Sequence, residues 1–330
     1  MKQILEKLYQ HQTLSENEAY SILTKIGNGE YSEVELASFV TIFNMRNLTL
    51  DELKGFRSAL LEMSVKLDLS QFDAIDIVGT GGDGKDTFNI STLACFVVAG
   101  AGQKVIKHGS YSSSSISGSS NIIEYFGYKF SNNQDVLKSE VEKNGICFLH
   151  APLFHPAMKN IAPVRKTLRV KTFFNILGPL INPAQPNHQL FGTYNNQTAR
   201  LYHYFLENTQ KNYVVIHSLD GYDEVSLTSP VKIYSKKGEE QLDFNNFGLL
   251  KPLSQQEIMG GKTVEENAQL FLSILQGKGT YAQNQVVIAN AAMALKCTKP
   301  NESLVTCIER AKESLNKGLA LSVFKKVMNL

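Results

Sequence analysis

The chain has 330 residues, 43% of them hydrophobic, and its 33 Lys and Arg almost balance its 31 Asp and Glu, which gives a formal net charge of +2 at pH 7. This length suits one large domain or two unequal ones, whereas near-neutral charge argues against binding to nucleic acid or to a membrane surface, where affinity depends on concentrated positive charge. No apolar stretch approaches the ~20 residues that cross a bilayer, and the N-terminus has no apolar run typical of a signal peptide, so we expect a soluble, cytoplasmic protein.

The first 70 residues are predicted to be wholly helical. Three capping boxes mark helix starts, because in each a hydroxyl can accept from a free helix N–H while a Glu three residues later reaches back. They are Ser15–Glu18, Ser32–Glu35 and Thr49–Glu52. One helix carries a broad apolar face made by Val34, Leu36, Phe39, Val40 and Phe43. A helical module with so much apolar surface needs a partner, which is either the rest of the chain or a second copy.

The pattern changes after Phe72. A strand over 74–78, a glycine-rich loop, a helix over 91–99 and a strand over 104–106 form a βαβ unit, which implies a parallel sheet. Further predicted elements are a strand over 213–217, a hairpin pairing 231–234 with 241–244, and helices over much of 254–276 and 283–296. We therefore predict an α/β protein with a small all-helical N-terminal domain (1–70, with part of 160–190 packed on it) and a larger α/β domain (71–330) whose mostly parallel central sheet is flanked by helices.

The loop between the first strand and its helix resembles several phosphate-binding templates. Residues 75–92 read IDIVGTGGDGKDTFNIST. A dinucleotide site would need an acidic residue ~20 positions on, and none lies between Asp86 and Glu124. A P-loop would need Ser or Thr after Lys85, where this chain has Asp86. A simple tight turn remains open, but four glycines in six residues exceed what a turn requires, and the polar helix start favours an anion site.

Two later segments carry polar residues directly after predicted strands. Residues 107–120 read KHGSYSSSSISGSS, which is either a flexible polar linker or a loop that grips a ligand, with Lys107 on phosphate. Ligands of parallel sheets bind beyond the carboxyl ends of the strands, which favours the second interpretation. Asp223 and Glu224 follow the strand over 213–217. Adjacent carboxylates suit Mg²⁺, which takes oxygen ligands, although an acidic pair on a loop is often only solvated.

Taken together, these segments resemble the anthranilate phosphoribosyltransferases. The resemblance spans nearly the whole chain and is carried by residues 76–92, the KHG segment with SGS at 117–119, and the blocks HPAMKNIAPVR (155–165), FFNILGPLINP (173–183) and DGYDEVSL (220–227). It implies Mg²⁺-dependent transfer of 5-phosphoribose from phosphoribosyl pyrophosphate (PRPP) to the amine of anthranilate, in tryptophan biosynthesis. It also implies a homodimer joined through the helical domains.

The resemblance also implies roles for individual residues. The PRPP site would comprise Gly79, Gly82, Asp83, Thr87, Asn89, Ile90, Ser91, Thr92, Lys107, Ser115 and Ser119. Anthranilate would contact Gly79, Ser110 and Arg165, and Mg²⁺ would be held by Ser91, Asp223 and Glu224. His108 is the one nearby candidate for a catalytic base, although we expect it mainly to shape the pocket.

The sequence departs from the family pattern after KHG. Most members have Asn where this chain has Ser110, and commonly Arg where it has Tyr111. The family's Asn contacts the aromatic substrate, so two alternatives stay open at this point. One is a related phosphoribosyltransferase or phosphorylase that acts on another nitrogenous ring. The other is a non-catalytic relative that binds the sugar phosphate.

Overall fold

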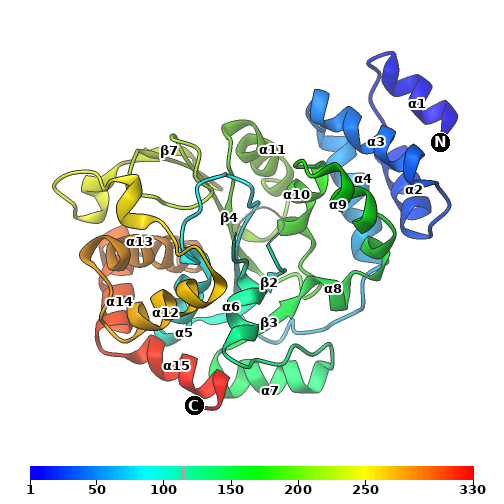
Figure 1. The fold of residues 1–330 in the computed structure, drawn as a ribbon. Coiled ribbons are helices and arrows are strands. Elements are labelled where there is room, and N and C mark those ends of the chain that lie inside the picture. The colour runs from blue at the N-terminus through cyan, green and yellow to red at the C-terminus, as the bar shows by residue number, and fades with distance from the viewer. Residues whose placement is uncertain (113–115) are drawn as a thin grey trace. The chain divides into compact units, whose positions relative to one another are not determined.

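The computed structural model describes residues 1–112 and 116–330 (Figure 1). The chain divides into two compact units. The helical unit comprises Met1–Leu67 and Ala151–Gln185, and the α/β unit comprises Asp68–His150 and Pro186–Leu330. Among the described residues, no helix combines the length and the apolar character needed to cross a membrane.

The helical unit contains only helices, joined by short loops. All three predicted capping boxes are confirmed, since Ser15, Ser32 and Thr49 each accept from the third residue of their helix. The helices are α1 (Lys2–Tyr9), α2 (Glu16–Gly27), α3 (Glu33–Met45), α4 (Leu50–Glu62), α8 (Ala151–Phe154), α9 (Ala162–Leu168) and α10 (Phe173–Leu177), with short 3₁₀ turns η1 (Pro156–Asn160) and η2 (Gly178–Ile181).

An aromatic cluster forms the core of the helical unit. Phe173 of α10 stacks on Phe56 of α4, with ring centroids 4.9 Å apart, and contacts Phe39 and Phe43 of α3. The predicted apolar face of α3 is confirmed except for Val34, which is 77% exposed. Successive residues of a helix are rotated by about 100°, which places residues 36, 39, 40 and 43 on one face and Val34 on the opposite face.

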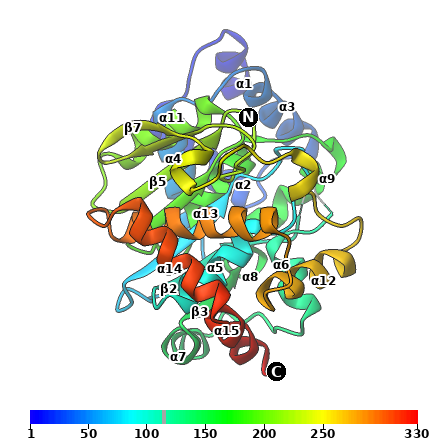
Figure 2. The same ribbon diagram turned by 90° about the vertical axis from the view of Figure 1, so that its left-hand side faces the viewer.

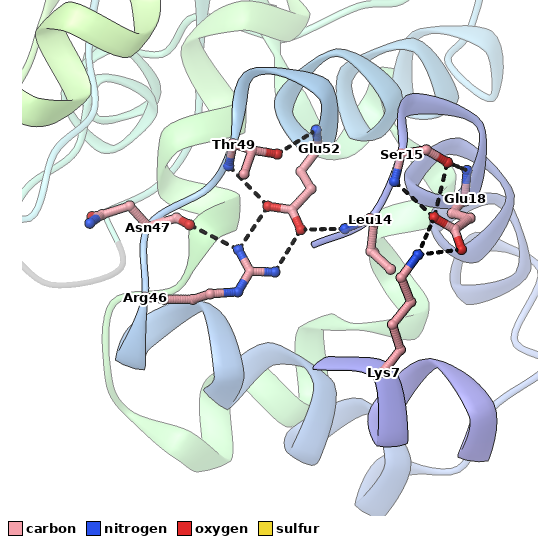
Figure 3. A network of polar contacts seen from close by, with 8 residues as sticks. All are labelled: Lys7, Leu14, Ser15, Glu18, Arg46, Asn47, Thr49 and Glu52. Carbon is pink, nitrogen blue, oxygen red and sulfur yellow. Dashed lines mark hydrogen bonds and ion pairs between the residues drawn. The ribbon is translucent and has the colours of Figure 1, made fainter. Parts of the chain in front are cut away.

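A buried ion pair ties the start of α4 to the preceding loops of the helical unit (Figure 3). The Glu52 carboxylate is fully buried and accepts from both terminal nitrogens of Arg46, at 2.6 and 2.8 Å, and from the main-chain N–H groups of Leu14 and Thr49. Burial alone would raise the pKa of Glu52, but the bonds from Arg46, Leu14 and Thr49 outweigh it and hold the pKa below 4.5.

Replacing Glu52 by Ala should therefore cost about 3–5 kcal/mol of unfolding free energy, because it leaves a partly buried guanidinium unpaired. Glu18→Ala is the matched control, since Glu18 is also a capping-box acid but its pair with Lys7 is much more exposed, and about 1 kcal/mol is expected. Because the folded-state pKa of Glu52 is lowered, its contribution should persist above pH 4.5 and be lost as the pH falls through the folded-state value. Urea unfolding of both variants measures this, and equal losses would contradict the assignment.

The α/β unit is built on a seven-stranded sheet of order β3-β2-β1-β4-β5-β6-β7. The first five strands in that order are parallel, and β6 and β7 are antiparallel. The strands are β1 (Ala74–Gly79), β2 (Lys104–Gly109), β3 (Ile146–His150), β4 (His188–Gly192), β5 (Asn212–Ser218), β6 (Val231–Ser235) and β7 (Gly238–Leu242). A small all-helical N-terminal part and a larger part with a mostly parallel sheet confirm the predicted fold class.

Helices cover both faces of this sheet. On one face, α5 packs against β1 and β2, and α13 packs against β4 and β5 (Figure 2). On the other, Tyr202 of α11 contacts Phe191 of β4, because alternate side chains of a strand point to opposite faces. The helices are α5 (Ile90–Gly100), α6 (Ser119–Tyr125), α7 (Gln134–Asn144), α11 (Asn196–Leu206), α12 (Val264–Leu275), α13 (Tyr281–Thr298), α14 (Leu304–Asn316) and α15 (Leu319–Met328), with 3₁₀ turns η3 (Phe244–Phe247) and η4 (Gln255–Ile258).

The predicted hairpin is correct in its first strand and wrong in its second. β7 covers 238–242, and residues 244–247 form the 3₁₀ turn η3. Two features shift the pairing. Gly238 has φ +105°, so the turn between the strands consists of Lys236 and Lys237 alone, and β7 begins at Gly238. At the other end of β7, the side chain of Asp243 accepts from the N–H of Asn245 and starts a helical turn.

Candidate active site

The candidate site lies where β1, β4 and β5 end. The chain places β2 and β3 on one side of β1 and then returns to place β4 on the other, and ligands of parallel sheets bind at such a reversal. Gly79 and Gly192 are paired at the ends of β1 and β4. A Cβ on Gly79 would clash with the Asp223 carboxylate, and one on Gly192 would clash with the Asp223 carbonyl oxygen. The two glycines therefore let the loop after β5 cross directly over the reversal.

The glycine loop, residues 80–89, is bound to that crossing loop. Gly81, which has φ +64°, donates its N–H to Asp223 Oδ2 at 2.7 Å. On its other side the loop is held by Gly260, whose N–H donates to the carbonyl of Asp86. The predicted residues Gly82 and Asp83 lie between these two anchors, and Asp83 acts electrostatically on Asp223 and Glu224.

The first turn of α5 binds the second acid of the pair. The N–H of Ser91 donates to Glu224 Oε1 at 2.9 Å, and the hydroxyl of Thr87 lies 3.4 Å from Glu224 Oε2. The predicted anion site at this helix start thus holds a carboxylate, as its partial positive charge favours. Ile90 and Thr92 are buried at this turn, and the N–H of Ile90 donates to the carbonyl of Phe88.

Asn89 connects α5 with the segment after β2. Its side-chain amide donates to the carbonyl of Ser117 at 3.0 Å, and the Ser117 hydroxyl returns a bond at 3.3 Å. The carbonyl of Ser110 accepts from the N–H of Ser120 and, at 3.5 Å, from the hydroxyl of Ser119. Ser115 lies outside the described residues.

Lys107 and His108 are both buried at the end of β2, each 3% exposed. The Lys107 ammonium donates to the carbonyl of Ile77 at 2.6 Å, and the main-chain N–H of His108 donates to Asp76 Oδ1 at 3.2 Å. The side chain of Tyr111 turns to Glu124, to whose carboxylate its hydroxyl donates.

The acid pair is a strong candidate for binding a divalent cation. Burial, and then the nearby charge of Asp83, raise the pKa of Asp223; burial, and then the charges of Asp223 and Asp83, raise the pKa of Glu224. Such clustered negative charge is stabilised by a cation, and carboxylate and hydroxyl oxygens are the donors that Mg²⁺ prefers. No group of three or more His, Cys, Asp and Glu suited to a metal exists within 1–112 and 116–330, so a cation at this pair would need hydroxyl, water or substrate oxygens as its other ligands.

Arg165 belongs to the helical unit. It lies on α9, with its guanidinium 5.5 Å from the Phe174 ring centroid and one terminal nitrogen 3.5 Å from Asn175 Oδ1. Burial lowers the pKa of its guanidinium. The other described residues of the predicted set all belong to the α/β unit.

Two residues near the site were missed from the sequence. Gly192 became recognisable only once β4 was placed beside β1. Lys85 extends over the ring of Tyr222, with its ammonium 4.8 Å from the ring centroid, and so links the glycine loop to the loop after β5. Lys85 follows the glycine-rich segment directly, whereas Gly192 lies in HQLFG (188–192), far from both that segment and DGYDE.

Both parts of the chain match known protein families. Residues 71–321 match the family described as "Glycosyl transferase family, a/b domain", and residues 2–64 match "Glycosyl transferase family, helical bundle domain". The anthranilate phosphoribosyltransferase of Flavobacterium psychrophilum is 55% identical over 100% of this chain and 99% of its own length. That of Cytophaga hutchinsonii is 51% identical over 99% of this chain and 100% of its own.

Two solved structures are similar throughout. The anthranilate phosphoribosyltransferase of Thermus thermophilus superposes with a TM-score of 0.90 at 31% identity, covering 98% of each chain. The Saccharomyces cerevisiae enzyme, solved in complex with PRPP and Mg, gives a TM-score of 0.89 at 27% identity, covering 98% of this chain and 96% of that one.

Proposed function

The chain belongs to the anthranilate phosphoribosyltransferase family, and we propose that it transfers 5-phosphoribose from PRPP to the amine of anthranilate. The products are N-(5-phosphoribosyl)anthranilate and pyrophosphate, and the step belongs to tryptophan biosynthesis. The observation that carries this proposal is the joining of the glycine loop, the first turn of α5 and the two acids in one hydrogen-bonded site. Full-length similarity to enzymes of this name supports it.

The fluorescence of anthranilate provides the test. Purified protein should consume anthranilate only when PRPP and Mg²⁺ are both present. Reactions without PRPP, and reactions with EDTA, are the controls. No loss of fluorescence at saturating concentrations of both substrates and Mg²⁺ would refute the proposal.

The proposed PRPP site uses the main chain of the glycine loop and of residues 89–92, with Lys107 and Ser119 on the phosphates. Charge moves toward the pyrophosphate as its bond to the anomeric carbon breaks, so fixed N–H dipoles aimed at it stabilise the transition state. Asp223, Glu224 and Ser91 are proposed to hold Mg²⁺, which when bound supplies positive charge beside the leaving group.

The acceptor needs little acid–base help. The amine of anthranilate is an aromatic amine and is neutral at pH 7, so it can attack without losing a proton first. The protein therefore acts mainly by orienting the two substrates and by electrostatics. We propose that His108, buried and bound through its main chain to Asp76, shapes the pocket and does not move a proton.

Arg165 is proposed to bind the anthranilate carboxylate. Arg165→Ala should raise KM for anthranilate by roughly tenfold or more, because a hydrogen bond to a charged group contributes about 1.5–3 kcal/mol. KM for PRPP should change by less than about twofold if Arg165 makes no phosphate contact. Arg165→Lys, which keeps the charge but not the planar fork, should lie between. Steady-state kinetics with each substrate varied measures both constants, and equal rises would remove Arg165 from the acceptor site.

We further propose a homodimer through the helical domain, taken as residues 1–70 with part of 160–190. The outward side of α3 carries Val34 and Met45, which are 77% and 85% exposed. Between them, the hydroxyls of Ser38 and Thr41 bond back to carbonyls of their own helix, so this side offers few free polar groups. A second copy would cover it.

Light scattering tests the dimer. The native protein in solution should have the mass of two chains. The double variant Val34→Asp/Met45→Asp should have the mass of a single chain. Val305→Asp is the control, because Val305 is similarly exposed but lies on α14 of the α/β unit. A dimer that survives the double variant would place the interface elsewhere.

A further inference from the structure

The main-chain hydrogen bonds between β1 and β2 end before either strand does, which leaves a separation in the pairing. Their ladder stops where Ile75 pairs with Val105, although β1 continues to Gly79 and β2 to Gly109. On their outer sides both strands stay paired to their last residues, β1 with β4 and β2 with β3. The separation therefore lies between two central strands, where an unbroken parallel ladder is the ordinary arrangement.

Charged side chains bond across this separation. The carboxylate of Asp76 accepts from the main-chain N–H of His108 at 3.2 Å, and the ammonium of Lys107 donates to the carbonyl of Ile77 at 2.6 Å. Asp76 is fully buried and Lys107 is 3% exposed. A continued ladder would satisfy main-chain groups here without burying a carboxylate and an ammonium, and burying charges is costly. Stability alone therefore does not account for them.

The separation is also where both proposed phosphate-binding segments begin. The glycine loop leaves β1 at Gly79, and Lys107, His108 and Gly109 form the end of β2. The side-chain bonds between the two strand ends thus help to set how far Lys107 and the main chain after it stand from the loop. Electrostatically, Lys107 also acts on Glu224, the acid bound at the start of α5.

We propose that Asp76 is a positioning residue for the transferase reaction. By holding the N–H of His108 on its side chain, it fixes the end of β2 relative to β1 and so sets the spacing at which Lys107 faces the glycine loop. The inference rests on the proposed function, because PRPP is the ligand that we propose both segments bind.

The test compares three variants with the native enzyme. Asp76→Ala removes the acceptor, and Asp76→Asn keeps an oxygen in the same place without the charge. Ile75→Val is the matched control, since Ile75 is the preceding residue of β1, is buried on the opposite face, and should lower only Tm. For each, KM is measured for PRPP and for anthranilate, together with Tm and hydrogen exchange of the amides of residues 104–109.

Asp76→Ala should raise KM for PRPP by about tenfold while KM for anthranilate stays within about twofold, because only the sugar phosphate depends on the spacing. Asp76→Asn should recover part of the loss and show faster exchange at His108. If Asp76→Ala changes both KM values alike, or no more than Ile75→Val does, Asp76 is only a structural residue and the inference is wrong.

Two further outcomes remain decisive. If Asp76→Ala does not fold, Asp76→Asn decides: a raised KM for PRPP with faster exchange supports the inference, and native values for both refute it. If the native protein turns over no anthranilate, the proposed function fails by itself. Calorimetry with PRPP and Mg²⁺ then decides, since weaker binding to Asp76→Asn supports the role of Asp76 and equal binding contradicts it.

Discussion

Replacing Asp223 by Asn and Glu224 by Gln together should lower turnover by roughly 10²-fold or more, while the protein remains folded. The double variant keeps the side-chain shapes but removes both charges that we propose hold Mg²⁺, and a charged group stabilising a leaving group typically contributes this much. The Tm should not fall, because burial and the nearby acidic charges disfavour the charged form of both carboxylates in the native protein. The anthranilate fluorescence assay across a Mg²⁺ titration measures the loss.

Asp220→Asn is the control for this experiment. Asp220 lies on the same loop, but its exposed carboxylate binds only the hydroxyls of Thr228 and Ser229 among the hydrogen bonds of the described residues. It should retain near-native turnover and Mg²⁺ dependence. Native turnover in the Asp223/Glu224 double variant would remove these acids from the metal site.

Gly192→Ala should lower activity by about 10²-fold through geometry alone. The added methyl group would overlap the carbonyl oxygen of Asp223, so the loop after β5 must move away from β4. A displacement of about 1 Å in a positioned group can cost about 10²-fold in rate, and overpacking costs about 1–3 kcal/mol in stability. The kinetic loss should therefore greatly exceed what partial unfolding explains, which kinetics and thermal denaturation of the same sample will show.

Gly178→Ala separates this steric effect from a general sensitivity to alanine. A Cβ at Gly178 meets no described atom within 4 Å, and the residue has ordinary helical dihedrals. It should retain activity and Tm. If Gly192→Ala is as active as Gly178→Ala, the close approach of Asp223 to the strand ends is unimportant for the reaction.

Two structural features that depend on local sequence were predicted correctly. The capping boxes and the βαβ unit depend on residues within a few positions of one another, and the structure confirms both. β3 and β4 were missed for different reasons. ICFLH at 146–150 is a short apolar run that does not distinguish a strand from a buried helix, and HQLFG at 188–192 opens with two polar residues.

Long-range relationships in the site could not be predicted from local pattern. That Gly81 binds Asp223, 142 positions away, depends on which strands are neighbours, and the reversal between β1 and β4 leaves no local trace. The likeness to a known family supplied the residue types of the site without their partners. Only the structure shows that the Lys107 ammonium donates to the carbonyl of Ile77 and that the Ser91 N–H donates to Glu224.

Those two bonds have a thermodynamic consequence. The ammonium of Lys107 and the N–H of Ser91 are already engaged by oxygens of the protein itself. A phosphate that binds either donor replaces a hydrogen bond that already exists. That donor therefore contributes to phosphate affinity only the free-energy difference between the new hydrogen bond and the one it replaces. A cation that draws Glu224 from Ser91 releases a donor for the sugar, and reciprocity requires that the sugar strengthen cation binding by the same factor. Neither ligand should therefore bind as tightly alone as in the presence of the other.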